Sequence, residues 1–226
     1  MTCKALLFGA IGTLAETSEL QRRAFNLAFI AHDLDWVWEP QTYYRMLHTP
    51  GGAARIARYA DDAGQTVDAA AVHQSKQANF EALVRRLGVE PRPGVEEVIS
   101  HCRETGIALG LCTTTSRAQV ELILENLSPK VSRQAFDWVG DRSMVARGKP
   151  SPDIYEAALL ALSVEASDAI AIEDTPESAE AALAAGLQVI GVPGVAARDR
   201  AFPEGVRVVD RADAALDLPR EAFAAE

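Results

Sequence analysis

Cysteine is scarce in this sequence and long apolar segments are missing, and each shortage excludes a class of protein. The three cysteines lie far apart, at Cys3, Cys102 and Cys112, which gives neither a disulfide framework nor the paired spacing of a zinc site. We expect small buried thiols in a reducing compartment, and therefore a cytoplasmic protein. No apolar run is long enough to span a membrane. The stretch after Lys4 is uncharged only as far as Glu16 and has no clear cleavage site. It therefore predicts a strand and a turn, not a signal peptide.

Positive charge is also in short supply. Lys and Arg total 22 against 32 Asp and Glu, which gives a net charge of -10. An acidic field of this size disfavours non-specific binding to nucleic acids or anionic membranes, and we expect neither as a partner. A small anionic ligand is still allowed, because a local cluster of donors can override the global field. Hydrophobic residues make up 48% and charged residues 24%, the composition of an ordinary globular protein with a sizeable core.

Short apolar runs alternate with helical patterns through the C-terminal two-thirds of the chain. The expected strands are residues 5–8, 107–113, 136–139, 169–172 and 188–192, and the expected helices are 95–105, 117–127, 152–162 and 176–186. Ser116, Ser151 and Thr175 are expected to cap three of these helices. Nearly continuous apolar strands are typical of a sheet covered on both faces. The alternation of strand and helix therefore predicts an α/β fold with a doubly wound parallel sheet.

Residues 17–87 have a different pattern. Apolar residues recur at helical spacing from Leu20 to Ala31 and again from Ala69 to Leu87, with no strong strand signal between them. The segment Glu90–Gly94 is typical of a linker. We predict a core made of residues 1–16 and 88–226, with residues 17–87 inserted as an α-helical cap domain.

Polar residues follow the predicted strands, where an open parallel sheet binds its ligands. These segments are Gly9–Leu14, Thr113–Thr115, Gly148–Asp153 and Glu173–Thr175. They offer backbone N–H groups, hydroxyls, one ammonium group and two adjacent carboxylates. That set suits a phosphate together with a hard cation such as magnesium.

Several of these segments form a joint pattern that is far more specific than any one of them. They are Phe8–Thr17, Arg22–Asn26, Gly51–Gly52, Arg55–Arg58, Thr113, Gly148–Asp153, Glu173–Pro176, Ala181–Ala182 and Ala184–Gly186. The pattern resembles the haloacid dehalogenase (HAD) superfamily of phosphatases, in the branch with a helical cap, and is similar to the CbbY proteins, sugar-phosphate phosphatases related to β-phosphoglucomutase. The resemblance covers about residues 4 to 195.

The resemblance implies roles for particular residues. Thr113 and Thr114 would contact the transferring phosphate, and Lys149 would contact both phosphate and nucleophile. Asp174 would be a magnesium ligand, with Glu173 in support. On the side of the substrate and the cap, the corresponding positions are Glu16, Gln21 and Arg55.

The first motif departs from the family. The family has Asp-x-Asp-Gly-Thr, in which the first Asp attacks phosphorus and binds the metal and the second is the general acid and base; this chain has Gly9 and Ile11. Gly cannot form an aspartyl-phosphate and Ile cannot move a proton. General acid–base help alone is worth ~10²–10⁴ in rate, and phosphate-monoester hydrolysis demands enhancements of up to ~10²¹.

The family's His, Thr and Lys are also replaced, by Gln21, Pro50 and Ala53. We therefore expect a retained scaffold that is inactive as a phosphatase, binds magnesium weakly or not at all, and takes a phosphorylated sugar.

Other readings stay open at this point. An active magnesium-dependent sugar-phosphate hydrolase with non-standard catalysis is one alternative, and a pseudoenzyme that binds a protein partner is another. Lys149 alone could be a solvated loop residue, Thr113 a plain strand end, and the Glu173–Asp174 pair an acidic helix start. Phosphate release from a panel of sugar phosphates, with and without magnesium, discriminates the active from the inactive reading.

Overall fold

The computed structural model describes residues 3–49 and 51–216. The chain divides into two compact units, one made of Met1–Glu16 with Val89–Glu226 and the other of Thr17–Gly88. Within the described residues, no helix is long and apolar enough to cross a bilayer.

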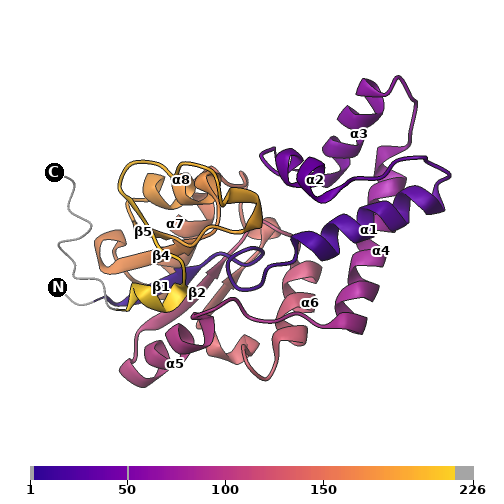
Figure 1. Ribbon diagram of the computed structural model, residues 1–226. Helices are drawn as coiled ribbons and strands as arrows, with labels where there is room; N and C mark the ends of the chain where they lie inside the picture. The colour runs from indigo at the N-terminus through magenta and orange to yellow at the C-terminus, as the bar shows by residue number, and fades with distance from the viewer. Residues whose placement is uncertain (1–2, 50, 217–226) are drawn as a thin grey trace. The chain divides into compact units, whose positions relative to one another are not determined.

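The first unit contains a six-stranded sheet whose strands are all parallel (Figure 1). In chain order the strands are β1 (Ala5–Phe8), β2 (Ala108–Cys112), β3 (Trp138–Gly140), β4 (Ala169–Glu173), β5 (Gln188–Gly191) and β6 (Val206–Val208). Their spatial order is β3-β2-β1-β4-β5-β6. Leu6 aligns with Leu109 on one side and Ile170 on the other. The strand order reverses at β1, which makes the carboxyl end of β1 the switch point where such sheets bind ligands.

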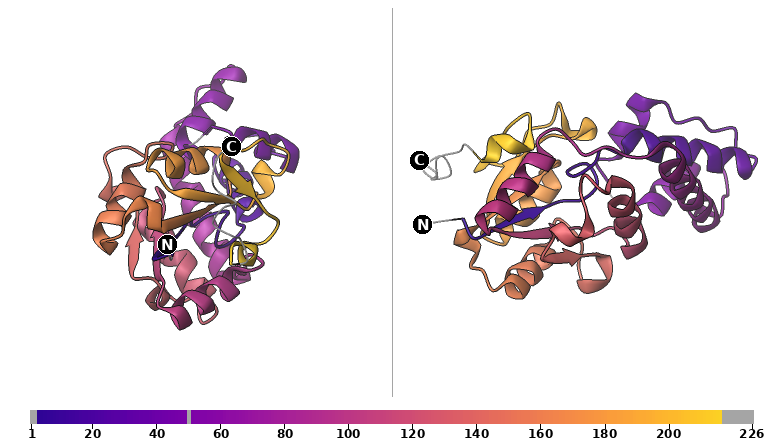
Figure 2. Two further views of the ribbon diagram at one scale, coloured as in Figure 1. Left: turned by 90° about the vertical axis from the view of Figure 1, so that its left-hand side faces the viewer. Right: turned by 90° about the horizontal axis from the view of Figure 1, so that it is seen from below.

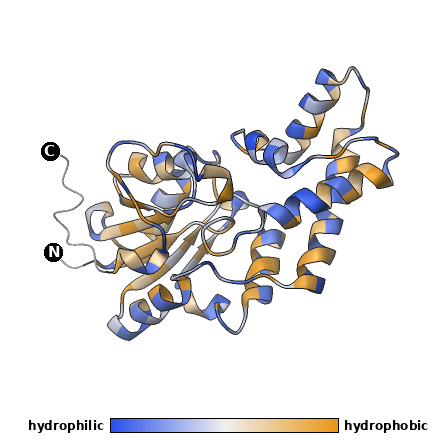
Figure 3. Cartoon of the chain, in the orientation of Figure 1, coloured by the Kyte–Doolittle hydropathy of each residue, from blue (hydrophilic) through white to orange (hydrophobic). Residues whose placement is uncertain are grey.

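Helices cover both faces of this sheet (Figure 2). They are α5 (Val95–Thr105), α6 (Arg117–Leu127), α7 (Asp153–Leu162) and α8 (Pro176–Ala184). Helices α7 and α8 lie on one face, where Leu7, Ala158 and Ala181 share one buried cluster. Helix α5 lies on the opposite face (Figure 1). Every residue of β1 is buried, and the hydropathy colouring shows apolar residues along the central strands (Figure 3). The predicted doubly wound α/β sheet is therefore confirmed.

The second unit is helical. It contains α1 (Ser18–Ala31), α2 (Pro40–Met46), α3 (Gly52–Asp62) and α4 (Ala69–Leu87). Its core is an aromatic cluster in which Trp38 lies 4.7 Å from the ring centroids of both Phe25 and Phe29. Trp36 packs edge-on to Phe29 and donates a hydrogen bond to Gln65. This unit thus has a hydrophobic core of its own.

The three expected helix caps differ in outcome. Ser116 is the N-cap residue of α6, as predicted, but its side chain makes no capping hydrogen bond. Helix α7 begins at Asp153, not Pro152, and the Ser151 hydroxyl bonds the Asp153 carboxylate instead of a backbone N–H. Thr175 does accept a hydrogen bond from the Ser178 N–H, so the third cap is confirmed. The sequence pattern predicted no strand at β6 and no bounds for α2 and α3.

Candidate functional site

The turn after β1 places backbone groups at the switch point. The Gly9 N–H donates to the Ile172 carbonyl on β4, which continues the pairing of the two strands. The chain then reverses, and the Gly12 N–H donates to the Ala15 carbonyl. Gly12 has a φ of 84°, a left-handed conformation that favours glycine. A Cβ at this position would also collide with the Asp174 carboxylate. Glycine is therefore required here on two grounds.

Glu173, at the end of β4, is 1% exposed and holds a buried ion pair. Its Oε1 accepts hydrogen bonds from Lys149 Nζ, at 2.6 Å, and from the Tyr155 hydroxyl on α7. The Lys149 ammonium also lies 4.8 Å from the centre of the Tyr155 ring. Burial, followed by the charge of Glu173, raises the pKa of Tyr155 well above its ordinary value, so the phenol stays protonated and donates. The Lys149 charge thus balances Glu173 inside the protein.

The space where position 9 would carry a side chain is filled. A Cβ built on Gly9 would lie 2.5 Å from Glu173 Oε2 and 2.5 Å from Thr13 Oγ1. Real Cβ atoms essentially never approach a heavy atom so closely. A side chain at this position therefore requires Glu173 or Thr13 to move, and Glu173 is held by Lys149 and Tyr155.

Asp174 faces a different part of the turn. Its Oδ1 accepts a hydrogen bond from Thr13 Oγ1 at 3.2 Å, and its Oδ2 lies against the backbone of Gly12. Burial raises the pKa of Asp174 to about 7, with further contributions from the charges of Glu173 and Glu16. Glu16 itself accepts a hydrogen bond from the Val195 N–H at 2.9 Å. The two adjacent carboxylates therefore both lie against the turn after β1, Glu173 beside Gly9 and Asp174 beside Gly12 and Thr13.

Arg92 is a component of this region that the sequence did not reveal. Its guanidinium donates to the carbonyls of Gly12, Val192 and Pro193, and so ties the turn after β1 to the loop after β5. Burial lowers the pKa of Arg92, while Asp174 and Glu16 oppose the shift. In the sequence, Arg92 is marked only by its position between two prolines, in a segment typical of a linker.

The threonines after β2 lie beside the loop that contains Gly148 and Lys149. Thr113 is 7% exposed, and its hydroxyl accepts a hydrogen bond from the Thr115 N–H at 3.2 Å. Thr114 is half-buried, and its Cβ would be 3.6 Å from a Cβ placed on Gly148. The structure thus brings the turn after β1, Thr114, Lys149 and the Glu173–Asp174 pair to one end of the sheet. Ile11 is half-buried in that turn.

Gln21 and Arg55 belong to the helical unit. Arg55 is 6% exposed and donates to the carbonyls of Met46 and Thr49, so its guanidinium supports the chain between α2 and α3. Gln21 accepts a hydrogen bond from Lys76 Nζ. Lys76 is buried between the rings of Phe25 and Phe80, at 4.9 and 5.1 Å from their centres. Lys76 lies on the apolar side of α4, four residues before Phe80, and this spacing could have indicated a buried lysine.

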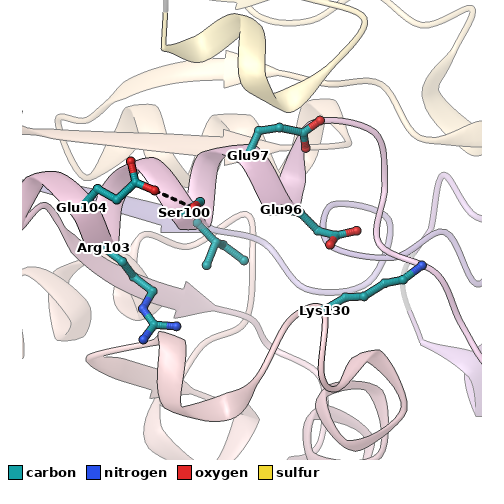
Figure 4. A pocket seen from close by; sticks show the side chains of 7 residues that line it. Glu96, Glu97, Ser100, Arg103, Glu104 and Lys130 are labelled. Atoms are coloured by element: carbon teal, nitrogen blue, oxygen red, sulfur yellow. Dashed lines mark hydrogen bonds between the residues drawn. The ribbon is translucent and has the colours of Figure 1, made fainter.

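A hollow on the first unit lies elsewhere. It is lined by Glu96, Glu97, Ile99, Ser100, Arg103, Glu104 and Lys130, chiefly from α5 (Figure 4). Its charged side chains are of both signs, and Ser100 donates a hydrogen bond to Glu104. None of the residues predicted for the site lines it.

Comparison with known proteins adds to this geometry. The model of the haloacid dehalogenase-like hydrolase family matches residues 3–186. The chain belongs to this family. Protein CbbY from Cereibacter sphaeroides is 40% identical over 212 residues, which cover 92% of this chain and 91% of that protein. Protein CbbY from Rhodobacter capsulatus is 35% identical and covers 85% of this chain and 86% of its own length. The resemblance to CbbY-type HAD proteins is therefore confirmed.

Solved structures agree. CbbY from Rhodobacter sphaeroides in complex with phosphate has a TM-score of 0.85 and 38% identity, covering 96% of this chain and all of that one. A mutant of the same protein in complex with xylulose-(1,5)bisphosphate has a TM-score of 0.83 and 39% identity, covering 93% and 95%. A β-phosphoglucomutase from Clostridium difficile shares the fold at a TM-score of 0.75 and 18% identity.

HAD-family phosphatases generally use magnesium, and the donors present in this member do not fit it. Gly9 and Ile11 offer no side-chain oxygen. Glu173 is already paired with Lys149 and Tyr155, and Asp174 contacts the other end of the turn. Across residues 3–49 and 51–216, no three His, Cys, Asp or Glu side chains are grouped so as to hold a metal ion.

Proposed function

We propose that this HAD-family chain binds a phosphorylated sugar without hydrolysing it, with the helical unit as its cap. The observation that carries the proposal is the filled space at Gly9, where Glu173 and Thr13 lie 2.5 Å from the position of the missing Cβ. No carboxylate can be delivered from that position to a phosphorus atom without rearrangement. Glu173 is buried, Asp174 is half-buried, and both accept hydrogen bonds, so neither stands ready as a replacement nucleophile.

Binding does not need the lost carboxylates. Backbone N–H groups of the turn after β1, the hydroxyls of Thr113 and Thr114, and the Lys149 ammonium are the groups that would hold a phosphate. The CbbY structures with phosphate and with xylulose-(1,5)bisphosphate support this ligand class. The absence of side-chain carboxylates at positions 9 and 11 also lowers the repulsion that a phosphate dianion meets.

The proposal is tested by phosphate release and by binding. Against a panel of sugar phosphates, with and without magnesium, we expect no release above background. Inorganic phosphate should raise the melting temperature, because a ligand of the native state stabilises it by mass action. Lys149→Ala should reduce that rise, while Lys130→Ala, which removes an exposed lysine, should leave it unchanged. Magnesium-dependent turnover that Lys149→Ala abolishes would contradict the proposal.

One observation favours a second candidate, a hydrolase with non-standard catalysis. Glu173 Oε2 lies 2.5 Å from where a Cβ of residue 9 would be, so Glu173 is the residue to take over the role of the missing Asp. This candidate predicts turnover that Glu173→Gln removes while Glu121→Gln, in the exposed ion pair with Arg117, retains it.

A further inference from the structure

One carboxylate oxygen of Glu173 is occupied by protein groups. Oε1 accepts from Lys149 and Tyr155, whereas Oε2 lies beside Gly9. A divalent cation could be bound by Oε1 only after a buried ion pair had opened. Breaking a buried pair leaves an uncompensated charge, which is strongly unfavourable.

Asp174 does not replace the carboxylate that is missing at Gly9. Its two oxygens contact Thr13 and the backbone of Gly12, whereas Glu173 contacts the Gly9 end of the same turn. Magnesium requires near-octahedral oxygen ligands and usually takes one or two carboxylates together with the phosphate oxygens of its substrate. Gly9 and Ile11 add no carboxylate to these two, and within residues 3–49 and 51–216 no three His, Cys, Asp or Glu side chains are grouped to hold a metal ion.

The Lys149 ammonium is a cation next to this turn that has a share of its hydrogen-bonding capacity left. An ammonium group has three donors, and Glu173 accepts one of them. We propose that the strand-end site binds a phosphate monoester dianion without any divalent cation, with Lys149 supplying the positive charge that magnesium supplies elsewhere in the family. This rests on the proposed function, because a ligand that is only held needs no metal to activate it.

Thermodynamic linkage gives the proposal a second testable consequence. If magnesium does not change the affinity for phosphate, then phosphate cannot change the affinity for magnesium. Coupled sites typically alter each other's affinity by about 5–150-fold, so a coupled site is readily told from an uncoupled one.

The experiment uses the full chain and inorganic phosphate as the probe. Phosphate is titrated calorimetrically in EDTA and in magnesium at equal ionic strength, because salt screens exposed charges. The expected result is a dissociation constant that agrees within about twofold between the two buffers, well below the coupling of linked sites. Lys149→Met should abolish binding in both buffers, while the matched Lys130→Met should bind like the unmodified chain. A sugar phosphate run alongside reports turnover.

Glu173→Gln separates the two possible roles of Glu173. If Glu173 only pairs with Lys149, the neutral amide of the variant leaves the Lys149 ammonium free for the ligand. Phosphate then binds several-fold more tightly in both buffers. If it holds a metal, the same change weakens binding in the magnesium buffer alone, and the proposal fails. Circular dichroism checks that this variant folds; if it does not, the two-buffer comparison on the unmodified chain still decides.

The remaining outcomes are equally clear. Phosphate binding strengthened more than about fivefold by magnesium overturns the metal-free site but leaves a non-hydrolysing binder intact. Release of phosphate from the sugar phosphate overturns the proposed function instead. Failure to bind in either buffer overturns both.

Discussion

At the scale of single residues, Lys76 combines a charge-bearing group with an apolar environment. Its ammonium lies between Phe25 and Phe80, and Gln21 is its hydrogen-bond acceptor. Burial, together with the charge of Arg55, lowers the pKa of Lys76 to about 7. The neutral amine is therefore the favoured form above neutrality in the folded protein, while the unfolded chain keeps its proton to about pH 10.

This difference predicts how stability changes with pH. Between the two pKa values the unfolded chain binds one proton more on Lys76 than the folded chain, so the free energy of unfolding rises with pH, at no more than about 1.4 kcal/mol per pH unit. Two groups act in the opposite direction: Asp174, whose pKa is raised to about 7, at the lower end, and the buried thiol of Cys102, whose pKa is raised to about 12 by burial, above its unfolded value. The contribution of Lys76 is therefore the difference from Lys76→Met in the window from pH 7 to about 8.5. Urea unfolding across that window should show the rise in the unmodified chain and in Lys130→Met, and lose it in Lys76→Met. An unchanged slope in Lys76→Met would show that Lys76 is charged.

At the scale of elements, the strand-end region depends on one side chain from the segment before α5. Arg92 joins the carbonyl of Gly12 to those of Val192 and Pro193, and a guanidinium fork is suited to such multiple acceptors. Without it, three buried or half-buried carbonyls lose their donor.

Arg92→Met should therefore destabilise the first unit by about 2–4 kcal/mol, given the worth of charged hydrogen bonds and the cost of unpaired buried groups. Arg92→Lys should recover only part, since a point charge cannot reach all three acceptors. The exposed Arg207 on β6 provides the matched control, and Arg207→Met should stay within about 0.5 kcal/mol. Urea unfolding measures the loss, and hydrogen exchange at Gly12 and Gly194 shows where it acts. Exchange unaltered at both amides would contradict the role assigned to Arg92.

The elements also show what sequence could and could not predict. Buried strands such as β1 and β4 were predicted to within a residue, because an apolar run in a covered sheet has one physical interpretation. Strand β6 is short and carries the exposed Arg207, so it lacks that signal. Arg92 acts on carbonyls about 80 to 100 residues away, a relation that no local pattern contains. The filled space at Gly9 likewise follows from the path of Glu173, which only the folded chain reveals.

At the scale of the whole molecule, the helical unit is one continuous stretch with its own aromatic core. Phe25, Phe29, Trp36 and Trp38 are buried there, and the chain enters at Thr17 and leaves at Gly88. A core of this kind gives a small unit enough buried surface for marginal stability on its own.

A fragment of residues 17–88 should therefore fold. We expect helical far-UV circular dichroism and, from the packed indoles, a near-UV signal that disappears in urea with a cooperative transition. Trp38→Ala should remove that transition, because deleting a buried aromatic costs about 3–5 kcal/mol, while Val37→Ala, at an exposed position, should keep it. A fragment without a near-UV signal or a cooperative transition would show that this unit depends on the rest of the chain.

The occupied space beside Gly9 has a consequence for the history of this chain. A change of Gly9 to Asp places a new Cβ 2.5 Å from Glu173 Oε2 and from Thr13 Oγ1, so one or both of these side chains must shift before it fits. It regains no proton-transfer group, because Ile11 is still apolar. The family motif is therefore regained only by changes at both positions 9 and 11, together with a shift of Glu173 or Thr13. Under the proposed function, descendants of this chain are expected to diversify as binders and not to return to catalysis.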